Sequence, residues 1–226
     1  MQLQKRILNA YRNQRYGAVS KLCRSLLRNQ PSDPFAHFHL ALAYYYTGKY
    51  SRALDHALLV RRKHSNHPNI HLNIGCILDA LGREDLAIRS YKRELSRYPE
   101  CAAALYNLGM LYYERRRCSD ALPFLRKCYE LRHSMGSVVL KLAFCYNRLG
   151  SIQEEIRLYR DHLKRHPRHV LCLMNLGSAL LDQSQYKQSL KCLERAKELA
   201  PKNSVINRWL KKAREGRASA SSTTRL

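Results

Sequence analysis

The chain has 226 residues, of which 45% are apolar, so it is long enough to bury a substantial core in one continuous folded unit. It carries 41 Lys and Arg against 17 Asp and Glu, which gives a formal charge of +24 at pH 7 and a pI near 10.1. No apolar run approaches the ~20 residues of a membrane-spanning helix. Composition therefore excludes a transmembrane protein and indicates an anionic partner, because solubility alone needs only about 2–8 net charges.

A spaced pattern recurs along the chain with a period of 34 residues, and its clearest copy is His71–Pro99. Gly75 and Ala87 provide small side chains where two helices would cross, Gly82 can end the first helix with a positive φ, and Pro99 stops the second. The first small position recurs as Ala41, Gly75, Gly109, Ala143 and Gly177, and the second as Ala53, Ala87, Ala121, Glu155 and Ser189. No insertion or deletion is needed to keep this frame.

This spacing resembles the signature of the tetratricopeptide repeat, a unit of two antiparallel helices in 34 residues. The resemblance implies an all-α fold, a tetratricopeptide-type α-solenoid in which helical hairpins form a right-handed superhelix with a C-terminal capping helix. It also implies an interaction scaffold, although the family serves many unrelated pathways and the fold alone names no partner.

Six tandem repeats are expected over residues 1–202. Their approximate ranges are 1–32, 35–66, 69–100, 103–134, 137–168 and 170–202. The first is the least regular, as terminal repeats often are, because Ile7 and Val19 replace its small residues. In the fifth, Glu155 occupies a small-residue position. We favour a slight register change that lets this carboxylate reach water, and the alternative is a local opening of the solenoid with a functional use.

The chain is expected to end in a capping helix over residues 203–214 and a disordered tail over residues 215–226. Asn203 or Ser204 can cap the helix, and Trp209 would cover the last apolar face of the solenoid. The tail is small and polar. Its final Thr-Arg-Leu matches a carboxy-terminal pattern that peptide-capturing domains bind, and its use is left open.

The eight cysteines form no Cys-x-x-Cys pair, so we predict free thiols in a reducing, cytoplasmic compartment and no disulfide framework. Prolines interrupt both histidine groups, and no acid or thiolate completes either of them. The two groups are His64, His67 and His71, and His162, His166 and His169. We therefore predict no metal site and no cofactor. No nucleophile–base pair or phosphate-binding glycine loop is visible, and no enzymatic activity is predicted.

The resemblance implies that the first helix of each pair lines a concave, peptide-binding surface. Asparagine amides suit this role because each offers a hydrogen-bond donor and an acceptor to a peptide backbone. The candidates are Asn73, Asn107 and Asn175 for the backbone, Lys5, Lys141 and Arg148 for acidic groups, His39 at the matching inward position, and Tyr106, Met110 and Phe144 for apolar side chains.

Two arrangements within the family are similar to this set. The asparagines resemble the ladder in the superhelix of the glycosyltransferase that adds N-acetylglucosamine to Ser and Thr, although this chain has no room for the transferase domain. Asn73, Asn107 and Lys141 also match three places of the carboxylate clamp of chaperone-binding domains. Asn69 and Ser137 stand where that clamp has lysines, which would weaken its hold on a carboxylate.

The sequence therefore predicts a non-enzymatic adaptor that binds an extended, acidic segment of another protein. One alternative is an RNA- or DNA-binding solenoid, because basic runs recur at the expected turns between repeats. A further alternative is a scaffold that self-associates through exposed repeat faces.

Overall fold

The computed structural model describes residues 2–131 and 136–223, and every regular element in these ranges is an α-helix. The helices are α1 (Gln2–Arg12), α2 (Tyr16–Asn29), α3 (Pro34–Tyr46), α4 (Tyr50–Lys63), α5 (Ile70–Ala80), α6 (Glu84–Arg97), α7 (Ala102–Glu114), α8 (Cys118–Leu131), α9 (Gly136–Arg148), α10 (Ile152–Arg165), α11 (Val170–Asp182), α12 (Tyr186–Leu199) and α13 (Ser204–Thr223). The predicted all-α repeat solenoid is confirmed. No helix in the described ranges has both the length and the apolar character required to cross a bilayer.

The turn within each helical pair has the same backbone conformation. One residue in each turn takes a φ between +55° and +72°, and these residues are spaced by 34 along the chain. They are Gln14, Gly48, Gly82, Arg116, Gly150 and Ser184. Glycine takes this left-handed conformation without steric cost, whereas other residues lose about 1–2 kcal/mol. The predicted role of Gly82 is therefore confirmed, and three of the turns keep their geometry against an unfavourable residue.

The small residues of the frame make room for a large side chain from the second helix of the same pair. A Cβ atom built on Gly75 would lie 2.5 Å from Cε1 of Tyr91, and one built on Gly177 would lie 2.6 Å from Cγ of Leu193. Tyr91 and Leu193 are almost completely buried. At these positions the buried side chains of Tyr91 and Leu193 therefore limit how closely the two helices approach.

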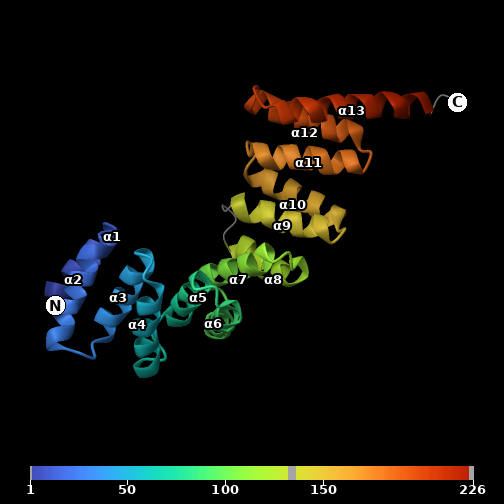
Figure 1. The fold of residues 1–226 in the computed structure, drawn as a ribbon. Helices are drawn as coiled ribbons and strands as arrows, with labels where there is room; N and C mark the ends of the chain where they lie inside the picture. Colours follow the sequence, from blue (N-terminus) through green and yellow to red (C-terminus); the bar gives the residue numbers. More distant parts are fainter. Residues whose placement is uncertain (1, 132–135, 224–226) are drawn as a thin grey trace. The chain divides into compact units, whose positions relative to one another are not determined.

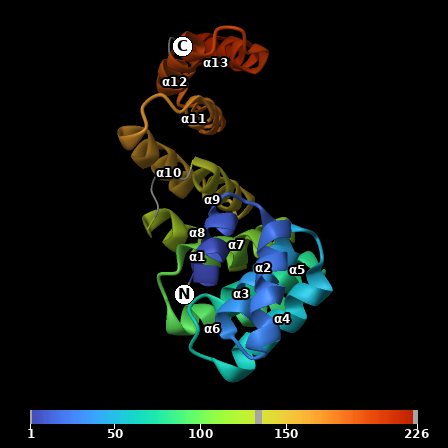
Figure 2. The same ribbon diagram turned by 90° about the vertical axis from the view of Figure 1, so that its left-hand side faces the viewer.

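The chain forms two compact units, Met1–Leu111 and Tyr112–Leu226, which are described separately. In the first unit, α1 to α5 pack in sequence, each helix against the next, and α6 packs against α5. In the second unit, α9 to α13 lie in successive layers (Figure 1). Both views place α12 and α13 together at the C-terminal end, beside α11 (Figure 2).

Helix α13 caps the second unit as expected. Ile206 and Leu210 are buried against α11 and α12, and Trp209 packs at the edge of this cluster. The side chain of Asn203 accepts a hydrogen bond from the backbone N–H of Val205 at 3.0 Å, so it caps the helix.

The expected tail differs from the structure, because α13 continues to Thr223 where residues 215–226 were expected to be disordered. The extra turns lie against the start of α12: a side chain on Gly216 would meet the ring of Tyr186, and Arg217 lies beside the same segment. Composition could not reveal this tertiary support. The final Thr-Arg-Leu lies outside the described residues.

Candidate functional site

The first unit contains a groove of about 300 Å³ that is lined by α4, α5 and α6, here called the arginine groove. Its cations are Arg61, Arg83, Arg89 and Arg93. Its apolar side chains are Leu54, Leu58, Ile74, Leu78 and Leu86. Among the described residues no carboxylate lines it. The groove therefore combines an apolar surface with four guanidinium groups.

Local sequence spacing explains how these arginines come together. Arg89 and Arg93 are four residues apart on α6, so they lie on one face of that helix. Arg61 belongs to the last turn of α4, where a cation complements the negative end of the helix dipole. Arg83 comes from the turn that precedes α6. All four side chains are exposed, and Leu86 beside them is 40% exposed.

A buried histidine, His71, also lines the groove. His71 is buried, with 3% of its surface exposed. Burial lowers its pKa most, and the nearby charges of Arg93, Arg97 and Arg61 lower it further. The imidazole is therefore neutral at pH 7, and the positive charge in this region belongs to the arginines.

A second cavity, of about 410 Å³, lies in the second unit and is called the α9–α11 pocket. Lys141 and Phe144 on α9 and Asn175 and Asp182 on α11 line it, together with Glu155 of α10. On each first helix the lining residues recur three or four positions apart, so one face of that helix is turned toward the cavity. This pocket contains three of the predicted peptide-binding residues.

Glu155 is buried in the wall of this pocket, with 6% of its surface exposed. Its Oε2 accepts a hydrogen bond from Nδ2 of Asn147 at 3.0 Å. Burial raises the pKa of Glu155, the Asn147 hydrogen bond lowers it, and the charge of Asp182 raises it. The expected register change that would bring Glu155 to water is therefore wrong. The carboxylate stays at the helix crossing, and an amide and the pocket accommodate it.

The predicted residues of the second unit are only partly available to a ligand. Asn175 makes a side-chain hydrogen bond with the buried Tyr159, whose pKa is raised mainly by burial. Phe144 is covered on one face by the guanidinium of Arg116, 5.3 Å from its ring centre, and its ring lies 5.3 Å from that of Tyr113. Arg148 is exposed at the end of α9 and does not line the pocket.

The predicted residues of the first unit lie on four helices, α1, α3, α5 and α7. Lys5 is exposed on α1. His39 of α3 is buried, its Nδ1 lies 2.9 Å from the carbonyl oxygen of Phe35, and burial lowers its pKa. This ring therefore belongs to the core and cannot form an open groove wall as expected.

The predicted asparagines of the first unit, Asn73 and Asn107, are half-buried. The predicted apolar residues Tyr106 and Met110 of α7 are half-buried as well. Asn107 donates from Nδ2 to the thiol of Cys76 at 3.1 Å, which ties α7 to α5. Asn73 lies on α5. The Asn107 amide is thus engaged within the protein, and a peptide would have to compete with Cys76 for it.

Sequence reasoning missed two buried polar residues, Glu94 and His162, which are each about 1% exposed. Glu94 on α6 accepts a hydrogen bond from the backbone N–H of Leu72 at 3.2 Å, and so caps the start of α5. The two residues occupy the same place in the 34-residue frame, where Val60 and Cys128 face the core. The sequence signal that could have identified both residues is a polar side chain at a core position of the repeat.

The prediction that no thiolate completes the histidines near Pro167 is also wrong. Sγ of Cys172 lies 2.8 Å from Nδ1 of His169, and Nε2 of His162 lies 3.0 Å from the same nitrogen. His169 and Cys172 are three residues apart at the start of α11, so helical spacing was a signal that could have brought Cys172 into this group.

The helical pairs, their turns and their packing define an α-helical repeat solenoid. Profiles described as "Tetratricopeptide repeat" match residues 5–68 and 72–132, and another match covers residues 170–203. The first profile alone covers more than half of the chain, and the chain belongs to the tetratricopeptide repeat family.

Curated proteins with similar sequences are much longer than this chain. Protein O-mannosyl-transferase Tmtc3 of Drosophila melanogaster is 25% identical over 166 residues, which are 72% of this chain and 18% of that protein. The probable UDP-N-acetylglucosamine–peptide N-acetylglucosaminyltransferase SPINDLY of Eustoma exaltatum subsp. russellianum is 27% identical over 145 residues, 62% of this chain and 16% of that protein. The chain thus spans less than a fifth of these relatives.

Solved structures share the fold at low sequence identity. The C-terminal part of a tetratricopeptide repeat protein from Cytophaga hutchinsonii has a TM-score of 0.78 and 17% identity over 98% of this chain and 89% of that one. YrrB, described as a tetratricopeptide protein with an unusual peptide-binding site, has a TM-score of 0.67 and 16% identity over 82% of this chain and 96% of that one.

Proposed function

We propose that this protein is a non-enzymatic adaptor whose arginine groove binds an acidic segment of a partner protein that also carries leucine-like side chains. Family membership supports a protein-interaction scaffold in general. The observation that carries the finer proposal is the set of four arginines around an apolar surface that no described carboxylate lines.

The chemistry of the guanidinium group fits this partner. Arginine forms paired hydrogen bonds to a carboxylate, and such charge-assisted bonds are about twice as strong as neutral ones. Leucine or isoleucine side chains of the segment would cover Leu58 and Leu86 and remove their surface from water. A segment that alternates acidic and apolar residues would satisfy both parts of the groove.

The first-helix surface is a poorer place for acids than the sequence suggested. Two carboxylates, Glu155 and Asp182, line the α9–α11 pocket together with Lys141. An acidic segment there would bring like charges together in a partly buried site, which is unfavourable. The acidic partner predicted from the net charge is therefore assigned to the second helices, α4 and α6, and to α5 between them.

Binding of acidic peptides to variants of the groove tests the proposal. A display library screened on the full chain should enrich peptides with alternating Glu or Asp and Leu or Ile. The double variant Arg89→Ala/Arg93→Ala should bind an enriched peptide at least about tenfold more weakly, since each charge-assisted hydrogen bond contributes about 1.5–3 kcal/mol.

A matched control variant distinguishes binding in the groove from general charge attraction. Arg62 neighbours Arg61 on α4, and Lys92 neighbours Arg93 on α6; both are exposed and neither lines the groove. The variant Arg62→Ala/Lys92→Ala removes the same charge and should bind the peptide as the unmodified chain does. Equal weakening of both double variants would reject the groove.

The same assay excludes or supports a nucleic-acid partner. If the groove served RNA or DNA, random-sequence oligonucleotides would compete with the peptide, and their affinity would fall steeply with salt. We expect no competition at 150 mM salt. Displacement of the peptide by oligonucleotides at that salt concentration would favour the nucleic-acid alternative.

A further inference from the structure

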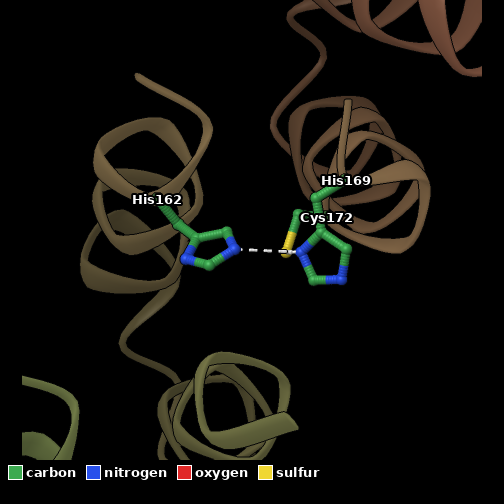
Figure 3. Close-up of side chains that lie close together, drawn as sticks. All are labelled: His162, His169 and Cys172. Carbon is green, nitrogen blue, oxygen red and sulfur yellow. Dashed lines mark hydrogen bonds between the residues drawn. The ribbon is translucent and has the colours of Figure 1, made fainter. Parts of the chain in front are cut away.

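Two histidines and a cysteine converge at the junction of α10 and α11 (Figure 3). His162 belongs to the last turn of α10, His169 is the residue before α11, and Cys172 is in the first turn of α11. The ligand atoms of the three side chains all lie within 4.8 Å of one another. His162 and Cys172 are fully buried, and His169 is half-buried.

One nitrogen of this cluster has two polar neighbours. Nδ1 of His169 is contacted by Nε2 of His162 at 3.0 Å and by Sγ of Cys172 at 2.8 Å. In a neutral imidazole, this nitrogen has either one hydrogen or one lone pair in the ring plane. It can make one good hydrogen bond with that single site, yet two neighbours compete for it. A cation between the three atoms would accept one lone pair from each.

The arrangement is close to the geometry of a zinc site. Zinc bonds of about 2.0–2.1 Å to nitrogen and 2.3 Å to sulfur place tetrahedral ligand atoms about 3.3–3.6 Å apart. The contacts of His169 with His162 and with Cys172 are within about 0.8 Å of that spacing, and rotation of the half-buried His169 side chain can adjust both distances. The hydroxyl of Tyr129 lies 3.2 Å from Nδ1 of His162, where it can orient the imidazole from behind.

We infer that His162 Nε2, His169 Nδ1 and Cys172 Sγ form a zinc-binding site, with water as the fourth ligand. The borderline-soft Zn²⁺ is suited to imidazole nitrogen and thiolate sulfur. On binding, the Cys172 thiol loses its proton to the buffer as the Zn–S bond forms. The ion would join the fifth and sixth repeats.

Zinc binding by the full chain tests this site directly. The protein is freed of metal with a chelator under reducing conditions and titrated with Zn²⁺ in a calorimeter. We expect one equivalent to bind with a dissociation constant below about 1 μM, and the heat should vary with the ionisation enthalpy of the buffer because a proton is released. No binding tighter than about 100 μM would overturn the inference.

Variants and a spectroscopic probe identify the ligands. Cys172→Ser and His169→Gln should each weaken zinc binding at least tenfold, and Cys172→Ser should remove the thiolate-to-metal charge-transfer band of the Co²⁺ complex. Cys192→Ser is the control, because that half-buried thiol on α12 is not part of the cluster. Retention of the band in Cys172→Ser would overturn the assignment.

Folding of the variants is checked separately. His169→Gln alters a half-buried loop side chain, so it should keep the helical circular dichroism of the unmodified chain even if Cys172→Ser perturbs the core. Unchanged zinc affinity in a folded His169→Gln protein would show that the three side chains only pack together and that the zinc site does not exist.

Discussion

Replacement of Glu155 by glutamine should stabilise the protein at neutral pH. Glutamine keeps the shape of the side chain and an oxygen that can accept from Asn147, but it cannot ionise, so the buried site no longer has to hold a carboxylate that the charge of Asp182 disfavours. A polar group that is buried without full compensation costs about 1–3 kcal/mol in mutational data. We expect a gain of that order in the free energy of unfolding.

The pH dependence of this gain follows from the direction of the pKa shift. The folded-state pKa of Glu155 is raised, so between the unfolded and folded pKa values the folded chain binds more protons than the unfolded chain. Rising pH through this window therefore destabilises the unmodified protein relative to Glu155→Gln. The difference is complete above the folded pKa and disappears below about pH 4, where Glu155 is protonated in both states.

Urea denaturation of both proteins, followed by circular dichroism between pH 4 and pH 8, measures the effect. A gain of 1 kcal/mol also corresponds to a rise of about 2–4 °C in the thermal midpoint of a chain of this size. If Glu155→Gln were less stable at pH 7, or if its advantage grew toward low pH, the carboxylate would be favourably bound and the account of its burial would be refuted. Asp161→Asn is the control, because Asp161 is a partly exposed acid on the same helix, where it pairs with Lys164.

Four further substitutions test the packing and the turns of the repeats, each by the urea midpoint. Gly75→Ala should cost about 1–3 kcal/mol because its Cβ would overlap the ring of Tyr91, and a neutral result would mean that the ring moves freely. Ser184→Gly should stabilise by about 1 kcal/mol at a positive φ, while Gly82→Ala should destabilise by about the same amount; a change of the same sign in both variants would contradict the turn argument. Glu94→Ala should cost about 1–3 kcal/mol and accelerate hydrogen exchange at the start of α5, and unchanged exchange would deny its capping role.

The fold could be predicted because the repeat signal depends on local steric rules. A residue with positive φ, a small residue and a stop recur at fixed spacing, and each constrains the backbone near its own position. The second helices of the pairs accordingly begin at Tyr16, Tyr50, Glu84, Cys118, Ile152 and Tyr186, 34 residues apart. The end of α13 was missed because its support comes from α12 rather than from its own composition.

The candidate sites were harder to predict because they combine side chains from different helices. Arg61, Arg83 and Arg93 come from α4, a turn and α6, and nothing in their separate surroundings indicates a common groove. The resemblance to peptide-binding relatives directed attention to the first helices, where His39 and Asn107 are engaged within the protein. Glu94 and His162 could have been found, because both are polar at a core position of the repeat frame.

A charge-swap experiment tests the acidic-segment proposal most directly. The variant Arg89→Glu/Arg93→Glu is measured against an acidic peptide selected by the unmodified chain and against the same peptide with its acids replaced by lysine. We predict that the variant loses the acidic peptide at least tenfold and binds the lysine peptide more tightly than the unmodified chain does. If both proteins bound the acidic peptide equally, the arginine groove would not be the binding site.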